Sequence, residues 1–243
     1  MRDKKYAIMG DIHSNWEALS VVLKDAESQG VDSYICVGDI VGYNADPVKC
    51  LNKIRELDCI AVKGNHDHYC SHDEHLEDFH PLAAEVVSWT RRQLSEDDVT
   101  YLKALKCSRI IAGFTVVHGT LDMPEKWGYV FDTLEAEANF NYQSTSVCFH
   151  GHTHVPLVYE KREFVQKNHP EVLNIELGKK YFINVGSVGQ PRDEDPRASY
   201  VIYDYKNKKI IFRRLEYDIV TAQEKIFKAS LPGILSADST TSE

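Results

Sequence analysis

The sequence lacks any apolar run that approaches the ~20 residues needed for a helix to span a bilayer. Its first residues, MRDKKYAIMG, pass directly from charged side chains into a strand-like pattern, without the apolar region or small-residue cleavage site of a signal peptide. We therefore expect a cytoplasmic protein with no membrane association.

Paired cysteines are also missing. The chain has six cysteines in 243 residues, and none of them forms a C-x-x-C pair. A disulfide framework is typical of small secreted domains, and thiolate zinc sites need closely spaced cysteine pairs. Neither is expected here, and the cysteines in apolar strands are interpreted as small hydrophobic residues.

Acidic residues outnumber basic residues, which gives a net charge of −9. Proteins that track an extended nucleic acid cluster lysine and arginine along the backbone contact, so such a partner is not expected. A small phosphorylated substrate remains compatible with this charge, because bound divalent ions supply local positive charge. The oligomeric state is open between a monomer and a homodimer.

What is present in the first third is an alternation of strand and helix signals. Predicted parallel strands joined by helices form a βαβαβ unit with right-handed crossovers. Asn15 is interpreted as a helix N-cap, and Asp46 as another, followed by Pro47 at the first helical position. The expected elements are strands near 5–9, 33–37 and 59–63 and helices near 15–29 and 46–57.

The remainder becomes rich in strands after a helical stretch at 79–105, in which Ser95 is a candidate cap between two helices. The charged stretch 160–179 is expected to be a protruding loop or hairpin. A single domain is predicted over 1–235, with a disordered tail at 236–243. The further expected elements are strands near 109–118, 146–150, 155–160, 172–177 and 180–185, a hairpin over 198–217 turning at 206–207, and helices near 132–139 and 219–229.

Metal-competent side chains follow five of the apolar runs. In a parallel α/β sheet, residues at the carboxyl ends of separate strands converge on one ligand site. The seven side chains provide two carboxylates, one amide oxygen and four imidazoles, enough for two four-ligand sites if one carboxylate is shared. Imidazole with carboxylate suits manganese, iron, zinc, nickel or cobalt. The seven residues are Asp11, His13, Asp39, Asn65, His118, His152 and His154.

The motifs that contain these residues resemble those of the calcineurin-like metallophosphoesterase superfamily in order and spacing. They are GDIHSN, VGDIVGY, KGNHD, VVHG and GHTH, and the resemblance covers roughly residues 5–215. GDIVGYNADP and NVGSVGQPRD further resemble a bacterial and archaeal branch of small phosphodiesterase-like proteins related to diadenosine tetraphosphatase. The resemblance implies a four-layer αββα sandwich of two mixed β-sheets flanked by helices, with a metal site at the carboxyl ends of the strands.

The resemblance also implies a role for each motif residue. Two divalent transition-metal ions per chain are expected, with manganese first among the candidates and iron, zinc, nickel and cobalt as alternatives. A hydroxide bridging the ions would attack phosphorus, and Gly38 would leave room for the ions. His66 would act on the leaving-group oxygen, and Asp67 would orient His66 or hold its proton. By resemblance, one ion is bound by Asp11, His13 and His154, the other by Asn65, His118 and His152, and both by Asp39.

Several residues near the motifs have open roles. Tyr43 and Asn44 either contact substrate or shape the turn before Asp46. Asn65 is a candidate substrate contact as well as a candidate metal ligand. Arg192 either clamps a phosphate or forms a surface ion pair with Asp193 or Glu194. His150 is expected to be structural. The histidine-rich segment 66–80, with His68, His72, His75 and His80, is expected to be a solvated loop rather than a substrate lip.

These observations favour a metal-dependent phosphoric ester hydrolase that acts on phosphodiesters, with nucleotide-type substrates and phosphomonoesters as further options. Two alternatives stay open. One is a non-catalytic, metal-bearing scaffold that binds protein partners through the same fold, and the other is a Ser/Thr-type protein phosphatase. A nuclease fits the acidic charge less well.

Overall fold

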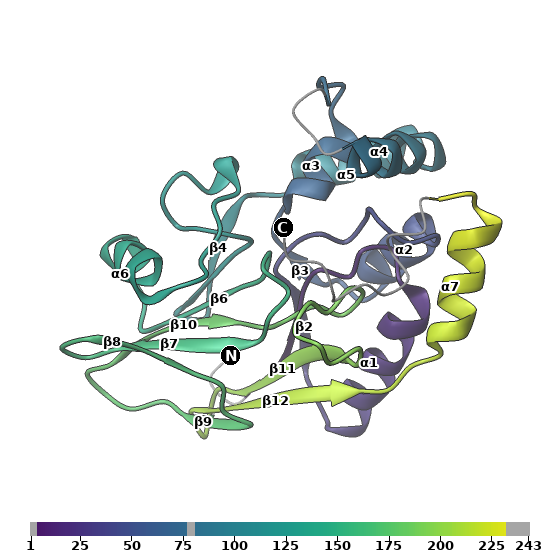
Figure 1. The fold of residues 1–243 in the computed structure, drawn as a ribbon. Helices are drawn as coiled ribbons and strands as arrows, with labels where there is room; N and C mark the ends of the chain where they lie inside the picture. The colour runs from purple at the N-terminus through teal and green to yellow at the C-terminus, as the bar shows by residue number, and fades with distance from the viewer. Residues whose placement is uncertain (1–3, 77–80, 232–243) are drawn as a thin grey trace.

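The structure is a computed structural model that describes residues 4–76 and 81–231 (Figure 1). The expected tail at 236–243 and His80 lie outside these residues. Among the described helices, none is long and apolar enough to cross a membrane. All six cysteines are free, and all but Cys107 are buried.

Two six-stranded mixed sheets face each other. In the first, β1, β2 and β3 are parallel, while β11 is antiparallel to β1, β12 to β11 and β9 to β12. This confirms the βαβαβ unit and the 198–217 hairpin. Its strand order is β3 (Ile60–Ala61), β2 (Ser33–Cys36), β1 (Lys5–Met9), β11 (Ala198–Asp204), β12 (Lys209–Leu215) and β9 (Val172–Asn174).

The second sheet combines two parallel pairs, β5 with β6 and β6 with β10, with antiparallel strands at its edges. Charged stretch 160–179 contains β8, which pairs with β7, and β9, which joins the first sheet, so the chain crosses here between sheets. The strand order is β4 (Ser108–Ile111), β5 (Phe114–Val117), β6 (Val147–His150), β10 (Lys180–Asn184), β7 (Leu157–Lys161) and β8 (Val165–Asn168).

Alternation of side chains along the strands explains the layers. Successive residues of a strand point to opposite faces. In β1, Tyr6 and Ile8 pack between the sheets, whereas Ala7 and Met9 pack against the helices of the first sheet. Because both faces of the central strands are covered, these strands read as continuous apolar runs.

Helices cover the outer faces of both sheets, which confirms the four-layer α/β sandwich (Figure 1). Helices α1 (Trp16–Ser28), α2 (Pro47–Glu56) and α7 (Ile219–Lys228) lie on the side of the first sheet, and α6 (Thr133–Tyr142) packs on the second. The Asn15 side chain accepts a hydrogen bond from the Ala18 N–H at 3.0 Å, as expected of an N-cap. The helices α3 (Asn65–Ser71), α4 (Pro81–Gln93) and α5 (Glu96–Ala104) form a group of their own beside the first sheet.

One local expectation was wrong, and two hold in part. The strand expected over 109–118 is the β4–β5 hairpin, whose turn at Ala112-Gly113 has two positive φ angles, +50° and +97°. Asp46 is the N-cap residue of α2 and Pro47 follows it at the first helical position, as expected, but the Asp46 carboxylate pairs with Lys225 and makes no capping hydrogen bond. Of the histidines expected in a solvated loop, His68 lies in helix α3 and is half-buried, whereas His75, beyond the helix, is exposed as expected.

Candidate metal centre

The seven predicted ligands come from the carboxyl ends of five strands and lie together between the two sheets. Asp11 and His13 follow β1, Asp39 follows β2, and Asn65 follows β3. His118 follows β5, and the pair His152 and His154 follows β6. Each sheet therefore supplies part of the site, because the parallel strands of both sheets end at the same edge.

Backbone strain is concentrated at these residues. A positive φ is uncommon for residues other than glycine, and where it occurs it marks turns or functional sites. Five of the seven candidate ligands have it, with φ between +46° and +70°. Hydrogen bonds from Asp11 N to Gly38 O (3.0 Å) and from His13 N to Asp39 O (2.9 Å) hold two of these turns against the next loop. The five residues are Asp11, His13, Asp39, His152 and His154.

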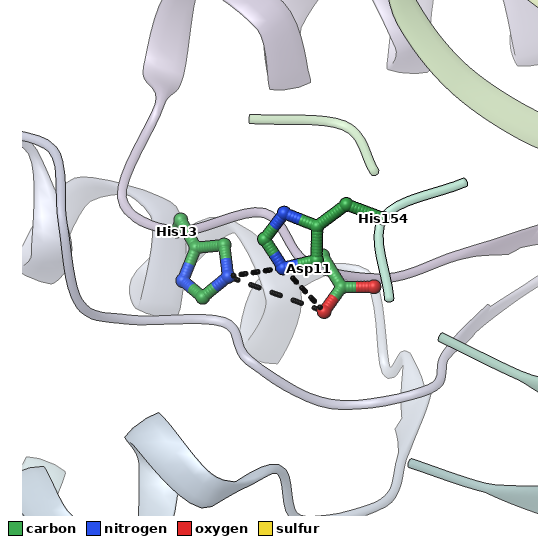
Figure 2. A group of neighbouring side chains, drawn as sticks. All are labelled: Asp11, His13 and His154. Atoms are coloured by element: carbon green, nitrogen blue, oxygen red, sulfur yellow. Dashed lines mark hydrogen bonds and ion pairs between the residues drawn. The ribbon is translucent and has the colours of Figure 1, made fainter. Parts of the chain in front are cut away.

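Asp11, His13 and His154 form one buried group of metal-binding atoms (Figure 2). His154 Nε2 lies 3.3 Å from Asp11 Oδ1 and 3.1 Å from His13 Nε2. At most 2% of each residue is exposed. Burial is the main reason that the pKa of His13 lies well below its usual value, so this imidazole is neutral.

A second group contains His118, His152 and the amide oxygen of Asn65. His118 Nε2 lies 3.1 Å from both His152 Nδ1 and Asn65 Oδ1. Asp39 is placed between the two groups, because its Oδ2 lies 3.5 Å from His13 Nε2 and 3.3 Å from His118 Nε2. Burial alone would raise the pKa of Asp39, but the surrounding imidazoles, His118 first, hold it well below its usual value.

The second ring nitrogen of each histidine is held by a backbone carbonyl. His118 Nδ1 donates to Val37 O at 2.9 Å, and His152 Nε2 donates to Trp127 O at 2.9 Å. Carbonyl partners of this kind fix the tautomer of a metal-binding histidine. With their protons there, the inward-facing nitrogens are lone-pair acceptors. The corresponding contacts of His13 and His154 are to Val41 O (3.3 Å) and Gln190 O (2.6 Å).

This donor set fits metal ions. The inward-facing imidazole nitrogens are only 3.1 Å apart and lie beside carboxylate and amide oxygens. All of these atoms are acceptors, and there are too few protons for hydrogen bonds between them. Without a metal, a proton shared with Asp39 relieves part of this repulsion: burial lowers the pKa of His118, but Asp39 raises it to about 9. The pKa of His152 falls to about 3, chiefly through burial and then through the charge of His118. Divalent ions with nitrogen and oxygen preference would satisfy both groups at once.

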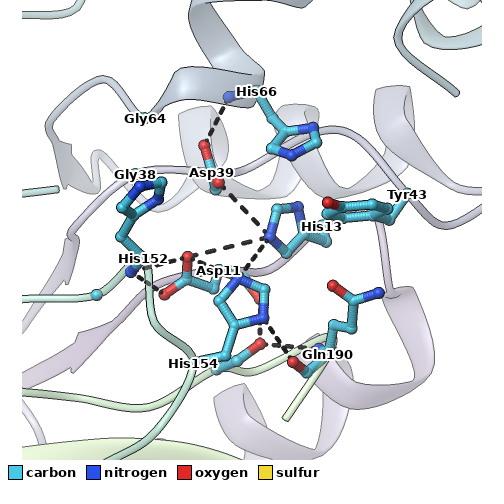
Figure 3. Close-up of polar contacts among 12 residues, drawn as sticks. Asp11, His13, Gly38, Asp39, Tyr43, Gly64, His66, His152, His154 and Gln190 are labelled. Atoms are coloured by element: carbon cyan, nitrogen blue, oxygen red, sulfur yellow. Dashed lines mark hydrogen bonds and ion pairs between the residues drawn. The ribbon is translucent and has the colours of Figure 1, made fainter. Parts of the chain in front are cut away.

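His66 lies directly above this set, on the first turn of α3 (Figure 3). Its backbone N–H donates to Asp39 Oδ1 at 2.9 Å, and its ring centre lies 4.8 Å from that of His13. The buried Nδ1 has no hydrogen-bond partner among the described residues. Burial lowers the pKa of His66 to about 4. The ring is therefore neutral near pH 7, and its Nδ1 makes no hydrogen bond with the described residues.

Comparisons with known proteins agree with this geometry. The model of the calcineurin-like phosphoesterase superfamily domain matches residues 5–208. The chain belongs to the calcineurin-like phosphoesterase superfamily. A metallophosphoesterase of Sphaerobacter thermophilus is 40% identical, with a TM-score of 0.87 and 96% of each chain covered. An uncharacterized protein of Methanocaldococcus jannaschii is 40% identical over 230 residues, 93% of each chain. A hypothetical protein of Pyrococcus horikoshii shares the fold at 16% identity, with a TM-score of 0.78 and 96% of each chain covered.

This membership confirms the prediction of a metal-dependent phosphoric ester hydrolase. The structure changes the interpretation of Asp67 within this phosphoesterase. Instead of contacting the His66 ring, its buried carboxylate accepts four backbone N–H groups. Oδ2 accepts from Asp39 (2.8 Å) and Gly64 (3.0 Å), and Oδ1 accepts from residues 40 (2.9 Å) and 41 (3.3 Å). Asp67 thus ties α3 to the loop that carries Asp39.

Close backbone approach explains the glycines of this loop. A Cβ on Gly38 would lie 2.7 Å from the backbone nitrogen of Gly64, and one on Gly42 would lie 2.5 Å from His66 Nδ1. Both glycines also have positive φ, +104° and +92°. Protein atoms therefore already fill the space beside Gly38 that the sequence suggested was reserved for the ions.

The structure shows where the residues lie whose roles the sequence left undecided. Tyr43 lies against His66 and His13, with ring centres 4.4 and 4.6 Å apart, and so borders the site. Asn44 is 6% exposed and donates to His13 O at 2.8 Å, which favours the turn-shaping role. The exposed Arg192 guanidinium donates to Gln190 Oε1 at 2.9 Å and lies near the Tyr43 hydroxyl, at 3.5 Å.

The alternative role of Arg192, a surface ion pair with Asp193 or Glu194, is not seen among the described residues, and Asp193 pairs with Arg214 instead. His150 is 1% exposed and stacks on Phe182 at 4.1 Å, as expected of a structural residue. Among the histidines of the 66–80 segment, His68 stacks on His72 with ring centres 4.1 Å apart, and its Nε2 donates to Glu74 Oε1 at 3.0 Å. These contacts are within the segment itself.

Sequence reasoning missed the groups that act through main-chain atoms or ring faces. The carbonyl oxygens of Val37, Trp127 and Gln190 orient the imidazoles of His118, His152 and His154, respectively. Every residue has a carbonyl oxygen, so the residue type does not predict this role. Tyr129 was also missed, although its ring stacks on His152 with centres 3.9 Å apart and planes at 19°. An aromatic residue between strands is too common to signal this contact.

Proposed function

We propose that this phosphoesterase hydrolyses phosphodiesters with two divalent transition-metal ions, and that manganese is the native metal. The observation that carries the proposal is the position of one oxygen, Asp39 Oδ2, at 3.5 Å from His13 and 3.3 Å from His118. These two histidines belong to different acceptor groups. A carboxylate shared by two such groups is the arrangement expected of a two-metal site.

The two groups would hold one ion each, and Asp39 would touch both. When bound, such ions supply a water of lowered pKa and positive charge opposite the phosphoryl oxygens. Side chains of this protein would assist the leaving group and bind the phosphate. The buried His66 is placed to donate a hydrogen bond or a proton to the leaving oxygen, and a bound phosphate's negative charge would raise its pKa from about 4 toward the working pH. Arg192, exposed at the rim, is placed to bind a phosphate oxygen.

The test uses metal-stripped protein reloaded in turn with manganese, nickel, cobalt, zinc or magnesium. Bound ions per chain are counted by mass spectrometry, and hydrolysis of a chromogenic phosphodiester and a monoester is followed. We expect two ions per chain and faster turnover of the diester. His66→Ala should keep both ions and lose activity by roughly 10²–10⁴-fold, whereas Asp39→Asn should lose ions and activity. His169→Ala, an exposed histidine of the β8–β9 loop, serves as the matched control.

Each alternative function has its own result in this experiment. Two bound ions without turnover of either ester would support the non-catalytic scaffold. Preferred turnover of the monoester would support a phosphatase, including the Ser/Thr type. One bound ion with full activity would contradict the two-metal proposal. The cytoplasmic location, the small phosphorylated substrate and the monomeric or homodimeric state stay predictions.

A further inference from the structure

Aromatic rings continue outward from the candidate metal centre. Tyr129 stacks on His152, and the plane of Phe131 is inclined by only 9° to that of Tyr129, with ring centres 5.2 Å apart. Such distances are typical of offset stacking. His152 is 4% exposed, whereas Tyr129 and Phe131 are 44% and 58% exposed. The rings therefore lead from a buried candidate ligand to solvent.

The segment that carries the two rings is fixed by its own contacts. Val130, between them, is 1% exposed and packs in the core beneath α6. The Phe131 N–H donates to Glu135 Oε2 at 2.5 Å, and its carbonyl accepts from Lys167 Nζ at 3.0 Å. Two large rings are thus presented to solvent on an anchored backbone, so binding a ligand on them costs little ordering entropy.

A cation also borders the candidate metal centre. The guanidinium carbon of Arg192 lies 5.9 Å from the centre of the Tyr43 ring, and the Arg192 backbone N–H donates to His154 O at 3.4 Å. Among the described residues, Arg192 has no carboxylate partner. The Arg192 guanidinium and the exposed rings of Tyr129 and Phe131 therefore both border the candidate metal-binding groups.

We propose that Tyr129 and Phe131 form a stacking platform for the base of a nucleotide whose phosphate lies at the candidate metal centre. This inference rests on the proposed function and narrows its substrates to nucleotide esters. Every base offers a π-face, so stacking accepts all bases. The larger purine ring covers more of the platform, and purine nucleotides should bind best.

The test compares two probes that differ in the base alone, adenosine 5′-monophosphate and ribose 5-phosphate. Their Kd values are measured by calorimetry on manganese-loaded protein. We expect the nucleotide to bind about 10-fold more tightly, about 1.4 kcal/mol. Phe131→Ala should reduce this ratio at least about threefold, and Phe131→Tyr should preserve it. Phe131 is chosen because the contact made with His152 belongs to Tyr129. Phe227→Ala, which removes an 85% exposed phenylalanine of α7, is the matched control and should leave the ratio unchanged.

Equal Kd values for the two probes, no binding of either probe, or a ratio insensitive to Phe131→Ala would overturn the platform. The same ratio loss in Phe227→Ala would do so as well. Because Kd is measured without turnover, the two proposals fail separately. A protein without hydrolytic activity that keeps the Phe131-dependent preference refutes the proposed function alone, and an active diesterase without that preference refutes the platform alone.

Discussion

Replacement of Asp67 by asparagine should show that this carboxylate builds the metal centre by holding the backbone. Its two oxygens accept four N–H groups, two each, in a site with no solvent exposure. In Asp67→Asn, one oxygen becomes an NH₂ group, so two of the four N–H donors lose their acceptor. Each buried unsatisfied donor costs about 1–3 kcal/mol, so the variant should lose about 4 kcal/mol of stability. That is a large part of the roughly 5–15 kcal/mol that stabilises a domain.

The assay pairs urea unfolding of the metal-free protein with calorimetric metal binding. Asp98→Asn is the matched control, because Asp98 is 4% exposed and caps α5 by accepting from Ser95 N at 3.0 Å, away from the candidate ligands. Both variants should be destabilised, but only Asp67→Asn should weaken metal binding, by about tenfold or more, because the N–H of Asp39 is released.

Three results would refute this reasoning. A stability loss below about 1 kcal/mol would mean that the four hydrogen bonds are not made. If Asp67→Asn bound metal as tightly as Asp98→Asn, Asp67 would act only as a helix cap. The third result is a strongly non-additive effect of Asp67→Asn and His66→Ala on kcat, with metal affinity unchanged. It would support the direct action of Asp67 on His66 that the sequence suggested.

Further predictions concern other parts of the molecule. Gly42→Ala should lower kcat more than metal affinity in steady-state and calorimetric assays, because its Cβ would press on His66 from a backbone with φ of +92°. Asp25 accepts hydrogen bonds from Arg213 (2.8 and 3.0 Å) and Tyr200 (2.6 Å). Burial raises the pKa of Asp25, but these partners lower it below 3.8. Asp25→Asn should therefore cost about 2 kcal/mol in urea unfolding from pH 8 to 5, and the difference should shrink only below about pH 4, as the wild-type carboxylate becomes protonated. Removing the metals with a chelator should lower the Tm, because the converging acceptors lose their common partner.

The positions of the candidate ligands were predictable because they depend on local pattern and general topology. An apolar run followed by aspartate or histidine marks a strand end, and parallel strands bring such ends together. His118 and His152 lie 34 residues apart in sequence and 3.1 Å apart in space, as this reasoning requires. The layers followed from the same pattern together with the family resemblance.

The features that sequence reasoning missed depend on contacts between distant segments. The positive φ of Asp11 or His154 is imposed by neighbouring loops, and neither residue is a glycine that would announce it. Helix α3 lacks a regular apolar spacing, and it begins where the Asp67 carboxylate accepts N–H groups from the preceding loop. The role of Asp67 was therefore invisible, since the sequence shows an acid beside a histidine and nothing of the four amides around it.

The division of the centre between two sheets has a consequence for synthesis of the chain. His13 meets His154, 141 residues later, and His154 is oriented by the carbonyl of Gln190. A nascent chain emerging from the ribosome can form the βαβαβ unit early, yet nearly two-thirds of the sequence must be available before the first acceptor group is complete, and nearly four-fifths before Gln190 can orient His154. Contacts of such long sequence separation form slowly. We therefore expect metal capture to be a late event in synthesis, because a shorter chain presents separate histidines and not the complete candidate centre.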